Sequence, residues 1–181
     1  MMSIVGFAMY LISTGLSFGV FSMLGGRGVL PNTTKQDIKG PQDHFVVDPS
    51  LPKTEECPIS GAYFTKPERE LWQKRRPLSV MIENHAESRP QSGLSSADVV
   101  YEAVAEGGIT RFMGIFYCGT ATPVTLAPVR SARTYFLPWV LEYDALYNHV
   151  GGAGRCSDDT VDERAKALCQ IETWKVKDMD Q

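Results

Sequence analysis

The sequence predicts a mixed α/β domain, a mixed sheet with a β-hairpin and covering helices, preceded by one N-terminal transmembrane helix. Three observations lead to this class. No charged residue occurs from Met1 to Gly26. Two β-rich runs within 99–117 flank Gly107-Gly108, and a two-residue hairpin turn needs positive φ at its centre. Apolar strand patterns near 78–83 and 145–150 alternate with helical patterns that begin at 131 and 158.

The composition is that of a globular protein. The chain has 181 residues, of which 43% are hydrophobic and 22% charged, and this balance excludes a disordered, collagen-like or disulfide-dense chain. The formal net charge is −3 and no long run of Lys or Arg occurs. A nucleic-acid partner bound through phosphate neutralisation is therefore not expected.

The N-terminal segment predicts membrane attachment. Residues 4–24 are apolar and about as long as the roughly 20 residues that a membrane-crossing helix needs. A cleaved signal peptide and a buried core helix are the alternatives. We expect residues 1–26 to be a transmembrane anchor, residues 27–55, which contain four prolines, to be a disordered tether, and residues 56–181 to be the α/β domain. Basic residues after the apolar run, taken alone, favour a cytoplasmic domain.

The cysteines allow disulfides but do not indicate a metal site. The four cysteines form no C-x-x-C motif and the three histidines are scattered, so we expect no zinc site and no metal. Two disulfides can form outside the cytoplasm, and three pairings are open. Buried free thiols are the alternative. The disulfide candidates are Cys57, Cys118, Cys156 and Cys169.

The hairpin predicts which side chains share a face of the sheet. With a two-residue turn, Glu106 lies opposite Ile109 and Glu102 opposite Met113. Because side chains alternate along a strand, Arg111 then lies between the two glutamates, while the other face suits the core. The alternative is an exposed ion pair of little consequence. The predicted polar face carries Glu102, Val104, Glu106, Arg111 and Met113, and the predicted core face carries Tyr101, Ala103, Ala105, Phe112 and Phe116.

Two further arginines predict an anion site. Ser131 is a candidate N-cap for a helix with Arg133 in its first turn, and Arg130 lies just before it. Positively charged side chains are unfavourable at a helix N-terminus, which already carries a partial positive charge, unless an anion is bound between them. We therefore expect Arg111, Arg130 and Arg133 to form an anion-binding site with Glu102 and Glu106. Structural pairing of the arginines with Asp98, Glu102 or Glu106 is the alternative.

No catalytic constellation is evident. The sequence lacks a G-x-S-x-G motif, a P-loop and an H-E-x-x-H motif, so whether the chain is an enzyme stays open. The candidate acids or bases are Asp98, Glu102 and Glu106. Further polar loop candidates are Asn84, Arg89 and Gln91, together with His149 at a strand end, where a lone histidine is usually structural.

Six blocks in order resemble the N-terminal domain of the YerB-type lipoprotein family, a bacterial cell-envelope family of uncharacterised role. The resemblance covers about residues 57 to 155 and implies a membrane-attached α/β protein outside the cytoplasm. No cysteine for lipid modification follows the apolar run, so attachment would be by the helix, and family members continue into a second domain. The blocks are Pro77-Leu-x-Val-Met-Ile-Glu-Asn-His, Arg89-Pro-Gln-Ser-Gly-Leu, Ala97-Asp-Val-Val-Tyr-Glu, Glu106-Gly-Gly-Ile-Thr-Arg-Phe, Pro128-Val-Arg-Ser-Ala-Arg and Tyr143-Asp-Ala-Leu-Tyr-x-His-Val-Gly-Gly.

The order of an Asp before a strand, a hairpin and Pro-x-Arg-Ser is also similar to the LytR–CpsA–Psr glycopolymer transferases. That similarity implies that Arg111, Arg130 and Arg133 hold a polyprenyl pyrophosphate, and that Asp98, Glu102 or Glu106 holds a divalent metal or acts as base.

We expect a binding or scaffold module with an Arg-rich anion site and no cofactor. An enzyme acting on a polyprenyl-linked envelope precursor is the alternative. The expected partners are the membrane, through residues 4–24, and a phosphorylated envelope lipid or glycan. The expected location is a single-pass anchor in the cell membrane with the domain outside.

Overall fold

The computed structural model describes residues 45–180. The expected anchor and residues 27–44 of the expected tether lie outside this range. No helix within residues 45–180 combines the length and the apolar character that crossing a bilayer needs. The last residues of the expected tether, from Lys53 onward, form a strand.

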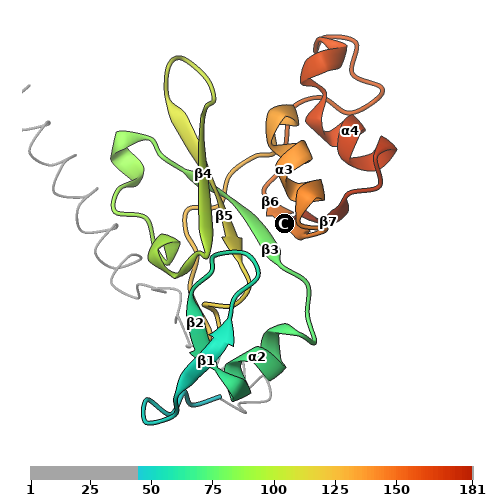
Figure 1. Cartoon of the computed structure of the whole chain (residues 1–181). Helices are drawn as coiled ribbons and strands as arrows, with labels where there is room; N and C mark the ends of the chain where they lie inside the picture. Colours follow the sequence, from blue (N-terminus) through green and yellow to red (C-terminus); the bar gives the residue numbers. More distant parts are fainter. Residues whose placement is uncertain (1–44, 181) are drawn as a thin grey trace, which may run out of the picture. The chain divides into compact units, whose positions relative to one another are not determined.

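The described chain forms two sheets (Figure 1). A small antiparallel sheet pairs β1 (Lys53–Glu56) with β2 (Tyr63–Thr65) and is followed by helix α2 (Lys66–Trp72). The main sheet has the strand order β4-β5-β3-β6-β7, in which β4, β5 and β3 are antiparallel and β3, β6 and β7 are parallel. This arrangement confirms the mixed α/β prediction. The strands are β3 (Leu78–Glu83), β4 (Val99–Val104), β5 (Thr110–Phe116), β6 (Leu146–His149) and β7 (Lys177–Asp180).

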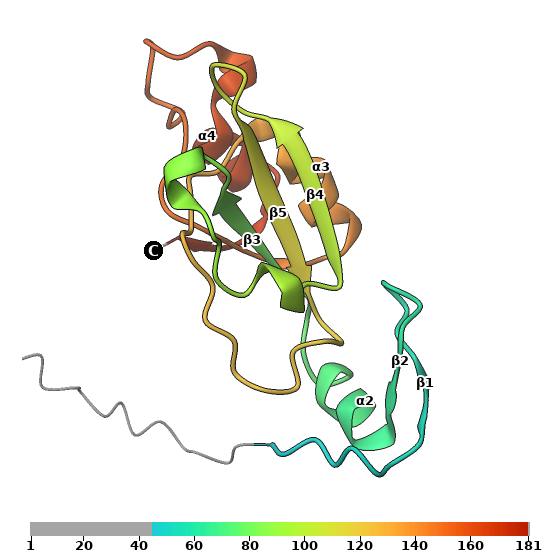
Figure 2. The same ribbon diagram turned by 90° about the vertical axis from the view of Figure 1, so that its left-hand side faces the viewer.

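Both faces of the main sheet are covered. Helices α3 (Leu137–Glu142) and α4 (Ala167–Thr173) lie on one face, and the segment between β3 and β4 lies on the other (Figure 2). Because side chains alternate along β3, Met81 packs under the helices while Val80 and Ile82 pack under the loops. Short 3₁₀ turns occur at Ala86–Ser88, Leu94–Ser96, Thr134–Phe136 and Glu163–Ala165.

The predicted hairpin is present, but its predicted register was wrong by one residue. Gly107 and Gly108 have φ of +60° and +79°, as the turn requires. Ile109 accepts a hydrogen bond from Ala105 N (2.8 Å) and donates one to Glu106 O (2.9 Å). Ala105 and Glu106, directly after β4, thus both face Ile109, directly before β5, which is a β-bulge.

Because of the bulge, side chains of β4 and β5 that were predicted to share one face of the sheet lie on opposite faces. Arg111 pairs with Ala103, and Glu102 pairs with Phe112. Arg111 therefore lies on the helix-covered face with Met113, and Glu102 lies on the opposite face.

Two predicted helices were also wrong. The segment at Ser131 is extended, because Ala132 donates to Gly151 O (2.9 Å) and Val150 donates to Arg130 O (3.1 Å). Ser131 is therefore no N-cap, and the α-helix begins only at Leu137. The helix expected from Asp158 to about Trp174 is reduced to α4, because side-chain oxygens of Asp158 and Asp162 accept local backbone N–H groups and form turns instead.

All four cysteines are in disulfides. Cys57 pairs with Cys118 (S–S 2.09 Å) and Cys156 with Cys169 (S–S 2.01 Å). The first disulfide attaches the β1–β2 unit to the end of β5, and the second attaches α4 to the segment before it. The structure thus contains one of the three disulfide pairings that the sequence left open, and the cysteines are not buried free thiols.

Candidate anion-binding site

The predicted arginines do not all converge. Arg111 and Arg133 meet at the carboxylate of Glu106, whereas Arg130 forms an ion pair with Glu83. Glu102 lies on the other face of the hairpin and joins neither pair. The predicted five-residue cluster is therefore a three-residue cluster with a separate ion pair.

Arg111 is the most enclosed member of the cluster. Its side chain is 4% exposed, and its Nη2 donates to Glu106 Oε2 (3.0 Å). Its Nη1 donates to the backbone oxygen of Ser131 (2.9 Å). Its Nε is buried and has no hydrogen-bond partner within residues 45–180. Buried polar groups are normally satisfied, so this guanidinium keeps unused donor capacity.

Arg133 and Glu106 complete the cluster. Arg133 reaches Glu106 through its Nε and donates from Nη1 to Ala132 O (2.7 Å). Glu106 stands in the Gly-Gly turn and its side chain is 56% exposed. Two guanidinium groups therefore share one carboxylate, and the cluster keeps one uncompensated positive charge.

Tyr135 adds a neutral hydroxyl beside these charges. Burial raises the pKa of Tyr135, and the Glu106 carboxylate raises it further against the opposing effect of the two arginines. The phenol therefore stays protonated at neutral pH and can donate a hydrogen bond.

The polar loop candidates form a network on the opposite face. The Asn84 side chain donates to Glu102 Oε1 (3.2 Å) and Thr110 Oγ1 (2.7 Å). Its oxygen accepts from Arg89 Nε (3.2 Å) and Gln91 Nε2 (3.0 Å). All four hydrogen-bonding positions of the amide are thus used within the protein. This network holds the loop after β3 in place, and it joins Asn84 to Arg89, Gln91 and Glu102. The Asn84 amide therefore has no hydrogen-bonding position left for a ligand.

Glu83, which the sequence analysis missed, anchors the same loop. Its carboxylate accepts from the backbone N–H of Asn84 (2.9 Å) and of His85 (3.1 Å), and it also accepts from Arg130. Burial opposes ionisation, but these hydrogen bonds outweigh it and lower the pKa of Glu83. A signal for this role was available, since a carboxylate that ends a buried strand needs a partner.

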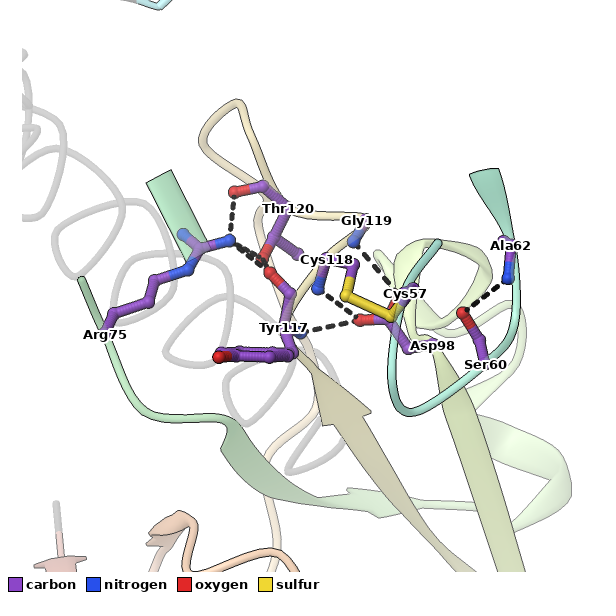
Figure 3. Close-up of a disulfide and its surroundings, with 9 residues drawn as sticks. All are labelled: Cys57, Ser60, Ala62, Arg75, Asp98, Tyr117, Cys118, Gly119 and Thr120. Carbon is purple, nitrogen blue, oxygen red and sulfur yellow. Dashed lines mark hydrogen bonds between the residues drawn. A yellow bond between two sulfur atoms is a disulfide. The ribbon is translucent and has the colours of Figure 1, made fainter. Parts of the chain in front are cut away.

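Asp98 has a structural role at the other end of β4. Its carboxylate accepts three backbone hydrogen bonds, from Tyr117 N (2.6 Å), Cys118 N (2.9 Å) and Gly119 N (3.0 Å) (Figure 3). The hairpin turn with Glu106 lies at the opposite end of this strand. Asp98 also forms, with Cys57 and Cys118, a group of metal-ligating side chains within residues 45–180, but the two sulfurs are bonded to each other and are not thiolates.

His149 belongs to the sheet and not to the arginine cluster. Its side chain is fully buried, with Nε2 2.7 Å from Asp178 Oδ1. Its Nδ1 lies 2.7 Å from the backbone oxygen of Gly151. The contact with Asp178 joins β6 to β7, and the contact with Gly151 holds the turn after β6. Both contacts are of the kind that a structural histidine makes.

Three comparisons place the chain among known proteins. The family described as “Protein of unknown function (DUF3048) N-terminal domain” matches residues 64–177. “Putative lipoprotein YerB” of Bacillus subtilis (strain 168) is 45% identical over 103 residues, which are 57% of this chain and 29% of that protein. The crystal structure of the YerB protein from Bacillus subtilis matches with a TM-score of 0.54 at 37% identity, over 70% of this chain and 38% of that chain.

The chain thus covers 29% of the curated relative and 38% of the solved one. The matched region contains the hairpin, the arginine cluster and the loop network described above. The similarity to YerB of Bacillus subtilis, in sequence and in structure, agrees with the resemblance seen in the sequence blocks. The chain belongs to the family of the DUF3048 N-terminal domain, whose function is unknown.

Proposed function

We propose that this chain is a non-catalytic binding module of a membrane-attached protein outside the cytoplasm, and that Arg111 and Arg133 hold the anionic group of a phosphorylated envelope lipid or glycan. One observation carries the proposal. Two guanidinium groups share the single carboxylate of Glu106, while a buried nitrogen of Arg111 has no partner within residues 45–180. The similarity to a protein named a lipoprotein supports the membrane location.

The charge balance favours an external anion. A buried guanidinium is destabilising unless it is paired and fully hydrogen-bonded. Glu106 accepts from Arg111 on one oxygen and from Arg133 on the other, but its single negative charge neutralises only one of the two. Phosphate oxygens match the fork of an arginine bidentately. Glu106 stands in an exposed glycine turn, so its carboxylate can move away from the arginines. A phosphorylated ligand then takes the place of this carboxylate.

The glycopolymer-transferase alternative has less support. It needs a carboxylate beside the arginines that is free to bind a metal or to accept a proton. Asp98 is engaged by three backbone N–H groups, Glu102 by Asn84 and Thr110, and Glu106 is already paired with both arginines.

The test is thermal unfolding of the full chain, purified in a non-ionic detergent, with three probes. Inorganic pyrophosphate tests the bare anion, farnesyl pyrophosphate a lipid and glucose 1-phosphate a glycan. A ligand at one hundred times its Kd stabilises by about 2.7 kcal/mol, which raises the Tm of a chain of this size by about 5–10 °C. We expect such a shift with at least one probe.

Matched variants separate the cluster from the nearby ion pair. Arg133→Gln should weaken binding of the active probe by at least about tenfold, whereas Arg130→Gln, the same change at the Glu83 pair, should leave it unchanged. Glu106→Gln should strengthen binding, because it removes the internal competitor. No shift with any probe, or an equal loss in Arg130→Gln, would refute the proposal.

A further inference from the structure

An apolar groove lies apart from the arginine cluster. Its volume is about 740 Å³, which is within the size range of pockets that hold small ligands, roughly 300–1,000 Å³. The walls come from Phe45, from α2, from the strands β3, β5, β6 and β7 (through Met179), and from the segment after β5. The apolar side chains that form them include Leu71, Leu78, Phe116, Val124, Leu126 and Leu146.

The charged side chains of this groove have one sign. Lys74, Arg75 and Arg76 line it, and no Asp or Glu is among the described residues that do so. Arg76 is paired with Asp144 outside the groove. Lys74, by contrast, forms no ion pair within residues 45–180. The rim thus keeps a positive charge next to an apolar wall.

Arg75 uses only part of its guanidinium. One terminal nitrogen donates to the backbone oxygen of Tyr117, and to the backbone oxygen (3.0 Å) and the hydroxyl (2.9 Å) of Thr120 (Figure 3). These bonds fix the segment that forms one wall. The side chain is otherwise exposed at the rim, and its Nε and second terminal nitrogen donate to no acceptor in the described chain.

We propose that this groove binds one acyl chain of an anionic lipid, with the chain against the apolar wall and the phosphate at Lys74 and Arg75. The argument is charge complementarity, because an apolar wall with an unopposed basic rim fits an amphiphile that has one hydrocarbon chain and one negative headgroup. A neutral apolar peptide would leave the rim without a partner. The proposal does not depend on the Arg111 site, since the two share no residue.

Photo-crosslinking in vesicles tests this inference. The full chain is mixed with or reconstituted into phosphatidylcholine vesicles that contain a trace of phosphatidylglycerol with a diazirine-labelled acyl chain. The crosslinked peptides are identified by mass spectrometry. We expect labelling on the peptides that contain Leu71 and Val124. With diazirine-labelled phosphatidylcholine the yield should be at least about fivefold lower, because each basic residue that faces an anionic headgroup contributes about fivefold.

Variants locate the two parts of the ligand. Lys74→Gln should lower the phosphatidylglycerol yield about fivefold, because it removes one of the two basic residues. Lys53→Gln, a change at an exposed lysine on β1, should not change the yield. Ala121→Trp fills the groove and should lower both yields, and Met179→Glu at the exposed wall should do the same if the tryptophan variant fails to fold.

Three outcomes would overturn the inference. Labelling that avoids the groove peptides would mean that the groove is closed to lipid, as a docked peptide segment would make it. Equal labelling by both lipids would show that the groove does not recognise the anionic headgroup. Labelling that persists in Ala121→Trp and Met179→Glu would place the acyl chain elsewhere.

Discussion

Removal of the Cys57–Cys118 disulfide should destabilise the protein more than removal of the Cys156–Cys169 disulfide. The first pair is separated by 61 residues and the second by 13. Since a disulfide stabilises mainly by restricting the unfolded chain, the loop-closure relation gives about 4 kcal/mol for the longer loop and about 3 kcal/mol for the shorter one. The difference of about 1 kcal/mol sets the order of the two variants.

Burial adds to this difference. Cys57 and Cys118 are each 1% exposed and pack against Trp72, so that alanines at both positions also leave unfilled volume. The sulfur of Cys156, in contrast, is near the exposed carboxylate of Glu172. The double variant Cys57→Ala/Cys118→Ala is therefore expected to lose at least 4 kcal/mol or so of unfolding free energy.

Guanidinium chloride unfolding measures the effect, with the fluorescence of the three tryptophans as the probe. The double variants Cys57→Ala/Cys118→Ala and Cys156→Ala/Cys169→Ala are compared with the oxidised protein at equal slope m. A smaller loss in the first variant than in the second would refute the reasoning, because it would show that neither loop length nor burial sets the contribution of these bonds.

Two further predictions concern the loop network. Asn84→Ala removes four side-chain hydrogen bonds and should lower the unfolding free energy by about 3 kcal/mol, against no more than about 0.5 kcal/mol for the exposed Gln73→Ala in the same denaturant titration. The lowered pKa of Glu83 stabilises the fold above about pH 4.5, its ordinary value, and this contribution is lost as the pH falls through the lower folded value. Glu83→Gln should therefore flatten the pH dependence of Tm below about pH 4.5. If the variant and the original protein lose Tm equally as the pH falls below about 4.5, Glu83 does not stabilise the fold in this way.

The strands could be predicted because local patterns determine them. The apolar run of β3 and the Gly107-Gly108 turn are both explicit in the sequence, and both are present in the structure. The bulge at Ala105 and Glu106 could not be predicted in this way. No residue there signals it, and it follows from placing Met113 and Ile115 under the helices, which is a tertiary requirement.

The candidate site was predicted in part, and partly for the wrong reason. Arg111, Arg133 and Glu106 do meet, but the meeting depends on the bulge and on the extended segment at Ala132, not on a helix start. Arg130 lies three residues before Arg133, and an odd separation in an extended segment places the two side chains on opposite sides. Arg133 therefore pairs with Glu106, whereas Arg130 pairs with Glu83. Long-range pairing of this kind has no local sequence signature.

The Cys57–Cys118 bond also determines how the domain carries mechanical load. Cys57 directly follows β1, and its partner follows β5. A pull applied through the residues before Cys57 passes along a covalent path to Cys118 and bypasses everything between them. The 61-residue separation corresponds to about 200 Å of extended chain that cannot be drawn out while the bond is intact. Helix α2 and strands β2, β3, β4 and β5 are thus shielded from tension. Beyond Cys118, the chain can be drawn out except for the loop that Cys156–Cys169 closes.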